Sequence, residues 1–273
     1  GLRYQSILGV SSNLMTIITS RGCPYLCTFC DVPYKKYRER SAKDVVDEIE
    51  ECMNLGYDEF HFYDDLFNVT KKKVIAFCDE IESRNLQVTW DFRGRVNKCD
   101  KETLARAKKA GCRMISFGVE TGTDEGLKIL KKSTTVAKIE QTFRYCRELG
   151  IITVADFIIG FGFEKTEKDI KQSVNWCINL DPDYAQFNIL QLLPNTPIFD
   201  EGLDKGLVDL DKWLSFAQDP KPGFAIDHWT EHLTLSQLRK LQTWAYRRFY
   251  LRKKYIIRSI RQTSTIYQFK TKF

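Results

Sequence analysis

Three cysteines, Cys23, Cys27 and Cys30, lie close together and are the side chains best placed to do chemistry. They are spaced four and then three residues apart, on a segment that also contains Gly22 and Pro24, so three thiolates could converge on one metal centre. A cubane iron–sulfur cluster takes one thiolate per iron, so three thiolates leave one iron without a protein ligand. An open coordination position distinguishes a reactive metal site from a structural one, as it does for zinc.

Two other interpretations of these cysteines stay open. A histidine or a water could complete a zinc site, or the thiols could be reduced and free of metal. Zinc sites usually combine such a half-site with a second Cys or His pair nearby. The chain has only three histidines, His61, His228 and His232, and none is close in sequence. The spacing and the strand that precedes the loop favour the iron–sulfur interpretation.

The other six cysteines are scattered singly, and nine are too few for a disulfide scaffold in a chain of 273 residues. An odd number, together with first residues that lack a signal-peptide layout, indicates a reducing, cytoplasmic compartment. Helix-like stretches contain four of them, which we expect to be buried as small apolar side chains: Cys52, Cys78, Cys146 and Cys177.

Strand and helix patterns alternate along the chain. Apolar, β-branched runs predict strands at residues 15–19, 60–63, 87–92, 113–119, 151–159 and 184–192. Helical spacing of apolar residues predicts helices at 42–55 (capped by Ser41 and ended by Gly56), 71–83, 101–110, 136–149 and 168–180. Six strands alternating with helices indicate a parallel sheet with crossover helices.

Such a sheet could be doubly wound or closed as a barrel. Several predicted strands end at a polar residue or a glycine: Asp64, Asp65, Arg93, Glu120 and Gly160. A barrel gathers these ends on one face, where active sites are built. A charged strand end also simply begins a solvated loop, which explains any one of them taken alone.

At the cysteine loop the chain resembles the radical S-adenosylmethionine (SAM) superfamily. The family signature is C-x3-C-x2-C after the first strand, often with an aromatic residue before the last cysteine, here Phe29; the resemblance covers roughly residues 14–200. It implies a partial (β/α)6 TIM-like barrel and a [4Fe–4S] cluster whose open iron binds SAM. It also implies reductive SAM cleavage to a 5′-deoxyadenosyl radical, a small-molecule substrate, and a flavodoxin- or ferredoxin-type electron donor.

The same resemblance implies contacts to the methionine part of SAM. Asp64 and Asp65 stand where the family contacts the methionine amino group, although the usual Gly-Gly-Glu turn is absent here. Arg93 and Arg95 could meet the SAM carboxylate, and a solvated salt bridge explains them equally well.

Contacts to the adenosine part follow from the fourth and fifth strands. Ser116 and Glu120 match the family's ribose contacts, since a carboxylate suits two hydroxyl donors. Gly160 and Gly162 stand where the family often has a Gly-Pro-Gly-Glu-Thr turn near the adenine, but this chain lacks the proline.

The chain resembles the cobalamin-associated radical SAM enzymes in five short sequence segments, at residues 37–41, 45–49, 62–67, 118–122 and 194–199. That branch includes methyltransferases and the anaerobic oxidative cyclase of bacteriochlorophyll synthesis, and it usually holds cobalamin in a separate domain before the core. Only a short segment precedes the first predicted strand, so we expect either a core cut from a longer protein or a short relative that works without cobalamin. The missing initiating Met favours the fragment.

The expected function is therefore radical methylation or rearrangement of an apolar or ring-containing metabolite. A methylthiotransferase acting on tRNA or protein and a non-catalytic zinc-binding module are the alternatives. The sequence does not identify the substrate. Phe187, Asn188 and Gln191 on the last predicted strand are candidates for facing it, although core packing explains Phe187 equally well.

The net charge of +6 is concentrated at the C-terminus. Eleven of the 42 Lys and Arg follow residue 238, where no Asp or Glu occurs, so the first 238 residues hold 31 basic against 36 acidic side chains. We expect a core barrel over residues 1–200, with the cluster loop at 20–33, and a helical, basic extension over 201–273. The predicted helix at 234–262 could pack on the core, lie peripherally on an anionic membrane or, least favoured, bind RNA.

Overall fold

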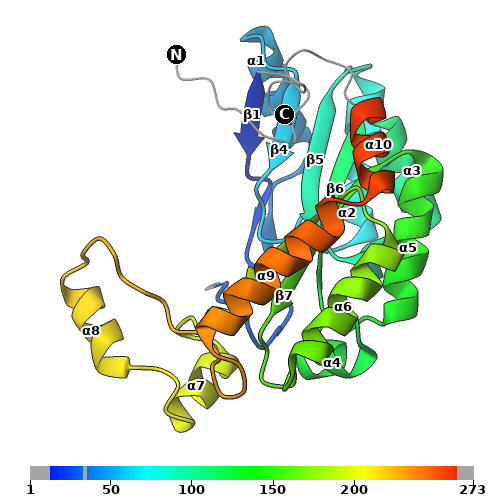
Figure 1. The fold of residues 1–273 in the computed structure, drawn as a ribbon. Helices are drawn as coiled ribbons and strands as arrows, with labels where there is room; N and C mark the ends of the chain where they lie inside the picture. Colours follow the sequence, from blue (N-terminus) through cyan, green and yellow to red (C-terminus); the bar gives the residue numbers. More distant parts are fainter. Residues whose placement is uncertain (1–12, 33–35, 263–273) are drawn as a thin grey trace.

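Six parallel strands form one sheet in which the spatial order follows the chain order (Figure 1). The computed structural model describes residues 13–32 and 36–262. The strands are β1 (Leu14–Ile17), β4 (Glu59–Phe62), β5 (Thr89–Gly94), β6 (Cys112–Glu120), β7 (Ile152–Ile159) and β8 (Tyr184–Ile189). Sequential parallel strands joined by crossover helices are the arrangement expected of a partial (β/α)6 barrel. All six predicted strands are confirmed, with ends that differ by up to three residues.

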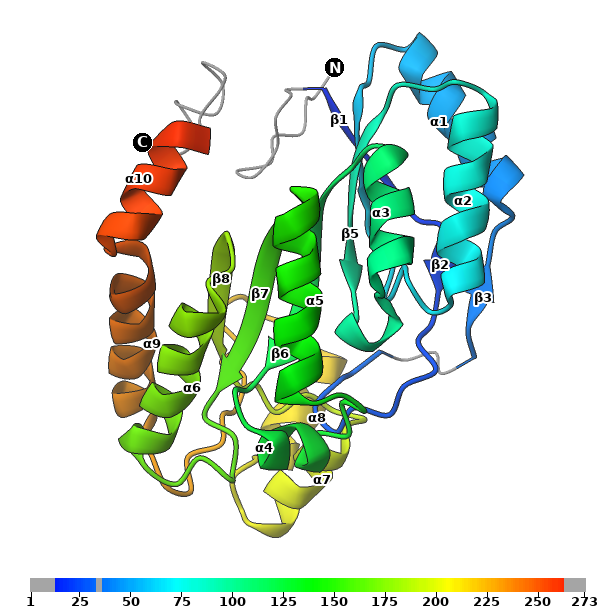
Figure 2. The ribbon, with the colours of Figure 1, turned by 90° about the vertical axis from the view of Figure 1, so that its right-hand side faces the viewer.

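Five helices connect the strands and lie along one face of the sheet (Figure 2). They are α1 (Ala42–Asn54), α2 (Lys71–Ser83), α3 (Lys101–Lys109), α5 (Val136–Leu149) and α6 (Glu167–Leu180). Each begins at a Ser, Thr or Asp whose side chain accepts a backbone N–H of the first turn: Ser41, Thr70, Asp100, Thr135 and Thr166. These caps explain why the helix starts could be predicted closely.

The core lies between the sheet and these helices. Alternate strand residues point toward the helices, and many of those in the apolar core are aromatic: Phe60, Phe62, Trp90, Phe92, Phe117, Phe157 and Phe187. The four helical cysteines are buried in the same layer, as predicted. Burial raises the pKa of the Cys78 thiol to about 12, which keeps it neutral and unreactive.

Several short elements were not predicted. Two-residue strands β2 (Ser20–Arg21) and β3 (Arg38–Glu39) pair with each other. The larger elements are connected by four short helical segments: the 3₁₀ turn η1 (Val96–Lys98), α4 (Asp124–Ile129), α7 (Pro197–Asp204) and α8 (Leu210–Gln218). Strands of two residues carry no periodicity. Helix α8 has apolar residues at helical spacing, Leu210, Trp213, Leu214 and Ala217, but none of its residues is buried.

The predicted C-terminal helix is two helices, α9 (Leu235–Tyr250) and α10 (Lys253–Gln262), separated at Leu251 and Arg252. Helix α9 buries four residues at helical spacing, Leu238, Leu241, Ala245 and Phe249, against β8 and α6. This part of the basic segment therefore packs on the core. The last part of the predicted extension, residues 263–273, lies outside the described part of the chain. Within the described residues no helix combines the length and the apolar character needed to cross a membrane.

Candidate functional site

The cysteine loop begins at the carboxyl end of β1 and is held there by two aspartates. The carboxylate of Asp64 accepts hydrogen bonds from the Thr19 N–H at 2.7 Å and from the hydroxyls of Thr19 and Ser20, both at 2.5 Å. Asp65 accepts from the Gly22 N–H at 2.8 Å. Both side chains therefore anchor the entry to the loop, and their predicted contact with the SAM amine stays a prediction.

Later in the loop, backbone hydrogen bonds fix it on two sides. The Thr28 N–H donates to Leu130 O, just after α4, at 3.3 Å, while Thr28 O accepts from the N–H of Ile198 in α7 at 3.1 Å. The Phe29 ring packs edge-on against Phe161, with 5.9 Å between centroids. The loop is therefore clamped at the carboxyl edge of the sheet, where active sites of such folds are built.

Cys27 is the buried cysteine of the three, and an arginine donates to it. Nη1 of Arg95 lies 3.2 Å from Cys27 Sγ, and the guanidinium carbon lies 4.0 Å from the centroid of the Tyr25 ring. The guanidinium of Arg95 thus points at the cysteine loop, and its predicted contact with the SAM carboxylate stays a prediction. Arg93, two residues earlier, is exposed and lies 5.0 Å from the Tyr63 ring centroid.

The donor set of the loop fits a cubane cluster. Among the described residues, no three Cys, His, Asp or Glu side chains converge at the distances that a single metal ion needs. A [4Fe–4S] cluster makes a different demand, because each thiolate binds its own iron. Three thiols within one clamped loop, one of them buried beside a cation, supply that kind of donor set.

Strand β6 ends in a buried ion pair beside the loop. Nζ of Lys132 lies 2.9 Å from Oε1 of Glu120, and Lys132 also lies 5.7 Å from the centroid of the Phe29 ring. Glu120 has a φ of 67°, a left-handed conformation that few non-glycine residues adopt. A Cβ at Gly118 would lie 2.5 Å from Glu120 Oε1, so the glycine leaves room for this carboxylate.

Ser116, the second predicted ribose contact, donates to Asp156 of β7 at 2.5 Å. Burial raises the pKa of Asp156 to about 6, and the negative charge of Glu120 contributes to the rise. Ser116 and Asp156 project from the sheet face opposite the helices, as alternation along β6 and β7 requires. The structure therefore brings Ser116 and Glu120 to the same side of the sheet.

Gly160 and Gly162 form a turn at the end of β7. The carboxylate of Glu164 accepts the N–H groups of Gly160 at 2.7 Å and Phe161 at 3.0 Å, while its other oxygen is buried without a hydrogen-bond partner. Burial raises the pKa of Glu164 to about 7. A Cβ at Gly162 would lie 2.7 Å from the Trp229 indole, so this position accepts only glycine without a shift.

A cavity of about 460 Å³ opens beside the turn and the cysteine loop. Its wall comes from five parts of the chain and mixes apolar side chains, such as Leu130, Phe161, Ile198 and Trp229, with charged ones, such as Lys165, Glu201 and Glu231. Pockets for organic ligands commonly have this size.

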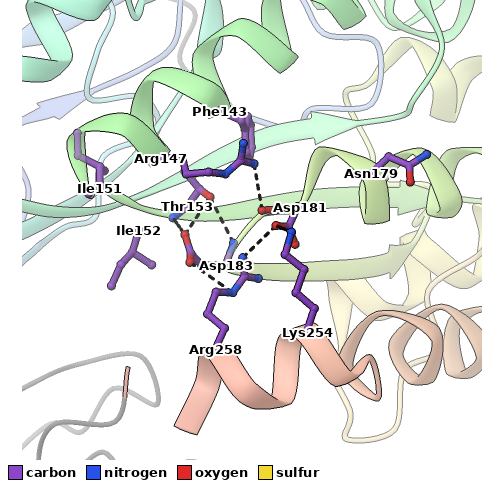
Figure 3. Close-up of a pocket in the computed structure, with 11 residues that line it drawn as sticks. Phe143, Arg147, Ile151, Ile152, Thr153, Asn179, Asp181, Asp183, Lys254 and Arg258 are labelled. Atoms are coloured by element: carbon purple, nitrogen blue, oxygen red, sulfur yellow. Dashed lines mark hydrogen bonds and ion pairs between the residues drawn. The ribbon is translucent and has the colours of Figure 1, made fainter. Parts of the chain in front are cut away.

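A second cavity, of about 490 Å³, lies at the opposite edge of the sheet, where β7 begins (Figure 3). Charged side chains pair within it, since Asp181 lies 2.7 Å from Lys254 and 3.4 Å from Arg258. Arg147 instead donates to the backbone oxygen of Leu180. This cavity joins α10 to the sheet and lies far from the cysteines, so we do not assign the chemistry to it.

Comparison with known proteins identifies the family. Residues 17–177 match the family model of the radical SAM superfamily. The chain belongs to this superfamily. Radical SAM proteins use a [4Fe–4S] cluster and SAM, and the clamped three-cysteine loop is the part of this chain that fits the cluster.

Two curated relatives of this radical SAM chain are an uncharacterized methyltransferase of Pyrococcus horikoshii and the anaerobic magnesium-protoporphyrin IX monomethyl ester cyclase of Cereibacter sphaeroides. The first is 29% identical over 89% of this chain and 53% of its own length. The second is 35% identical over 86% of this chain and 38% of its own length. The chain thus spans about half or less of the length of the relatives it matches.

The fold is similar to that of TsrM, a radical SAM methyltransferase from Kitasatospora setae solved with tryptophan and a SAM analogue. The TM-score is 0.66 at 27% identity, over 71% of this chain and 39% of TsrM. Another structure of TsrM holds cobalamin and a [4Fe–4S] cluster. The predicted resemblance to cobalamin-associated radical SAM enzymes is confirmed by these comparisons.

Sequence reasoning missed three polar residues of the site. Lys132 follows α4 in a polar stretch, Asp156 is a single acid within an apolar strand, and Asn68 lies in a loop after β4. Asp156 could have been found from the sequence, because an acidic residue within an apolar strand needs a polar partner when it is buried. Nothing local marks Lys132 or Asn68.

Proposed function

We propose that this chain is the radical SAM core of an enzyme that methylates or rearranges an apolar or ring-containing small molecule. The observation that carries the proposal is the clamped three-cysteine loop at the carboxyl edge of the sheet, directly beside the buried Glu120–Lys132 pair. A metal-binding module without catalysis has no need for a strained, buried carboxylate next to its cysteines.

In this proposal Cys23, Cys27 and Cys30 hold the cluster. When bound, the cluster supplies the electron that cleaves SAM and starts radical chemistry. Glu120 accepts hydrogen bonds from the SAM ribose, and Ser116 offers its oxygen lone pairs while its hydroxyl donates to Asp156. Phe29, packed edge-on to Phe161, shields the same region from water.

Gly160 and Gly162 would allow the adenine to approach the backbone closely, because a Cβ at Gly162 has no room. Asp64 and Asp65 would present what remains of their hydrogen-bonding capacity to the methionine amine. The electron donor would be a flavodoxin or a ferredoxin.

The kind of substrate is inferred from the relatives. Their names include a cyclase that acts on a magnesium-protoporphyrin ester and a bacteriochlorophyllide methyltransferase, and TsrM was solved with tryptophan. All three molecules contain conjugated rings, which supports a ring-containing substrate. Cobalamin, held by a domain outside this sequence, would serve as methyl carrier or radical partner.

Anaerobic reconstitution with iron and sulfide tests the proposal. We expect a brown protein that converts SAM to 5′-deoxyadenosine after reduction, measured by chromatography. Cys27→Ser should lose cluster iron and SAM cleavage, whereas Cys146→Ser, on the buried face of α5, should retain both. A colourless protein with stoichiometric zinc would contradict the proposal. Full-length protein that cleaves SAM but binds no corrinoid by absorbance would remove only the cobalamin-dependent branch.

A further inference from the structure

Arg95 is a buried cation whose charge has no carboxylate partner among the described residues. Its side chain belongs to a residue only 8% exposed. The guanidinium contacts that the described residues provide are Cys27 Sγ, the backbone oxygen of Lys132 and the face of the Tyr25 ring. None of these is a carboxylate, and burying an unpaired charge costs several kcal/mol.

Of these contacts, the Cys27 sulfur is the one that would bind iron in the proposed cluster. The Nη1–Sγ separation of 3.2 Å is that of a hydrogen bond, so the guanidinium already donates to this ligand. A cysteine that binds a cluster does so as a thiolate, and a cation beside it would offset that negative charge.

The position of Arg95 is fixed from several directions. The side-chain amide of Asn68 accepts from the Arg95 N–H at 2.9 Å and donates to the Arg95 oxygen at 2.9 Å, so it grips both backbone groups. The second guanidinium nitrogen donates to the oxygen of Lys132. Such a network holds the donor on Cys27 and leaves the guanidinium little freedom to turn toward another ligand.

We propose that Arg95 raises the reduction potential of the cluster by donating a charged hydrogen bond to its Cys27 ligand. The inference rests on the proposed function. Reduction adds one electron from a flavodoxin- or ferredoxin-class donor to the cluster, while no covalent bond and no proton of Arg95 changes. The added negative charge is stabilised by a nearby cation, and hydrogen bonds to the cluster sulfurs are a known determinant of such potentials. Arg95 is thus a positioning residue and does not itself contact the reacting atoms.

Redox titration of the reconstituted, full-length protein, followed by electron paramagnetic resonance, tests this role. Arg95→Met should lower the ratio of reduced to oxidised cluster at a fixed potential about tenfold, which for a one-electron couple is about 59 mV. Arg95→Lys keeps the charge but cannot reach Cys27 and Lys132 together, so we expect an intermediate shift. Arg147→Met is the matched control, because it also removes a guanidinium bonded to a backbone oxygen, but at the opposite edge of the sheet.

The outcomes separate the two proposals. Unchanged potentials in both Arg95 variants, with iron content equal to that of the wild type, would overturn the role of Arg95 and leave the proposed function standing. Loss of iron in Arg95→Met, with native circular dichroism and iron retained in Arg95→Lys, would support it, because Cys27 would then depend on the cation. A wild-type protein that assembles no cluster would contradict the proposed function itself.

Discussion

The ammonium of Lys132 and the carboxylate of Glu120 lie 2.9 Å apart, and both side chains are less than 10% exposed. Removing one member of such a pair leaves the other charge buried and unpaired, which typically costs 3–5 kcal/mol. We therefore expect Glu120→Gln to lower the free energy of unfolding by about 3 kcal/mol or more, measured by urea denaturation of the cluster-free protein.

The double variant Glu120→Gln with Lys132→Met is the control for this pair. Removing both charges together should cost clearly less than the sum of the two single changes, because neither charge is then left alone. Additive costs would show that the two side chains do not interact. The two variants that lack the Glu120 carboxylate should also lose SAM affinity if Glu120 binds the ribose, and calorimetry on the reconstituted protein measures that separately.

Glu164 predicts a dependence of stability on pH. Burial raises its pKa from 4.5 to about 7, so the folded protein binds this proton more tightly than the unfolded chain does. The resulting stabilisation is complete below about pH 4.5 and is lost as the pH rises through 7. Glu164→Gln stays neutral, so it should exceed the wild type in stability at pH 8 by at most about 3 kcal/mol. The difference should vanish near pH 4.5.

Urea denaturation at several pH values between 4.5 and 8 measures this difference. Glu125→Gln, on the exposed side of α4, is the matched control and should show no gain that grows with pH. A gain at Glu164 that is constant across the range would point to packing and not to the buried charge.

Most of the fold could be predicted because its signals are local. Helices α2 and α5 were predicted with their observed ends, since Thr70 and Thr135 cap them and the apolar spacing is regular. The break between α9 and α10 was missed, because the apolar and basic pattern runs on through Leu251 and Arg252 without a proline or a glycine. Phe187 illustrates the limit of pattern reasoning. Its ring faces α9, 5.5 Å from that of Tyr246, and not a substrate, which only the packing of a distant helix decides.

The sequence predicts the cysteines of the site, but not the side chains that contact them and Glu120. The spacing of the cysteines carries the cluster signal within one loop, whereas the Arg95–Cys27 and Glu120–Lys132 contacts join segments 68 and 12 residues apart. Arg95 was named as a candidate contact to the SAM carboxylate, but the sequence does not say in which direction the side chain turns. Asn68 decides that direction by holding both backbone groups of Arg95.

A tyrosine hydroxyl of α9 pairs both backbone groups of one residue in the edge strand β8. The Tyr250 hydroxyl accepts from the Ala185 N–H at 3.1 Å and donates to the Ala185 oxygen at 2.8 Å. Tyr250→Phe removes both partners at once, so we expect a loss of about 1–3 kcal/mol in unfolding free energy. Tyr246→Phe is the matched control, because it leaves only the Phe187 N–H unpaired while Gln242 keeps the Phe187 oxygen bonded. Equal losses in the two variants would contradict this account.

The basic C-terminal segment makes a final prediction at Asp181, where three cations meet (Figure 3 shows two of them). The carboxylate lies 2.7 Å from Lys254, 3.4 Å from Arg258 and 3.6 Å from Arg252, and the residue has a φ of 55°. Asp181→Asn keeps a residue that tolerates this left-handed backbone and removes the charge. We expect faster hydrogen exchange over α10 and earlier proteolysis there, with the rest of the sheet unchanged.

Two further substitutions separate the three cations. Arg258→Met should reproduce much of the effect of Asp181→Asn, since this arginine is mostly buried and also donates to Pro182 O at 2.6 Å. Lys254→Met should change the unfolding free energy by less than about 0.5 kcal/mol, because its side chain is 73% exposed and water screens the pair. If Lys254→Met had the larger effect on α10, exposed surface charge would hold this helix at Asp181. High salt should then release α10 in the wild type as well. Under the arrangement in the structure, salt should loosen α10 only slightly, because Asp181 is shielded from solvent by the arginines that bind it.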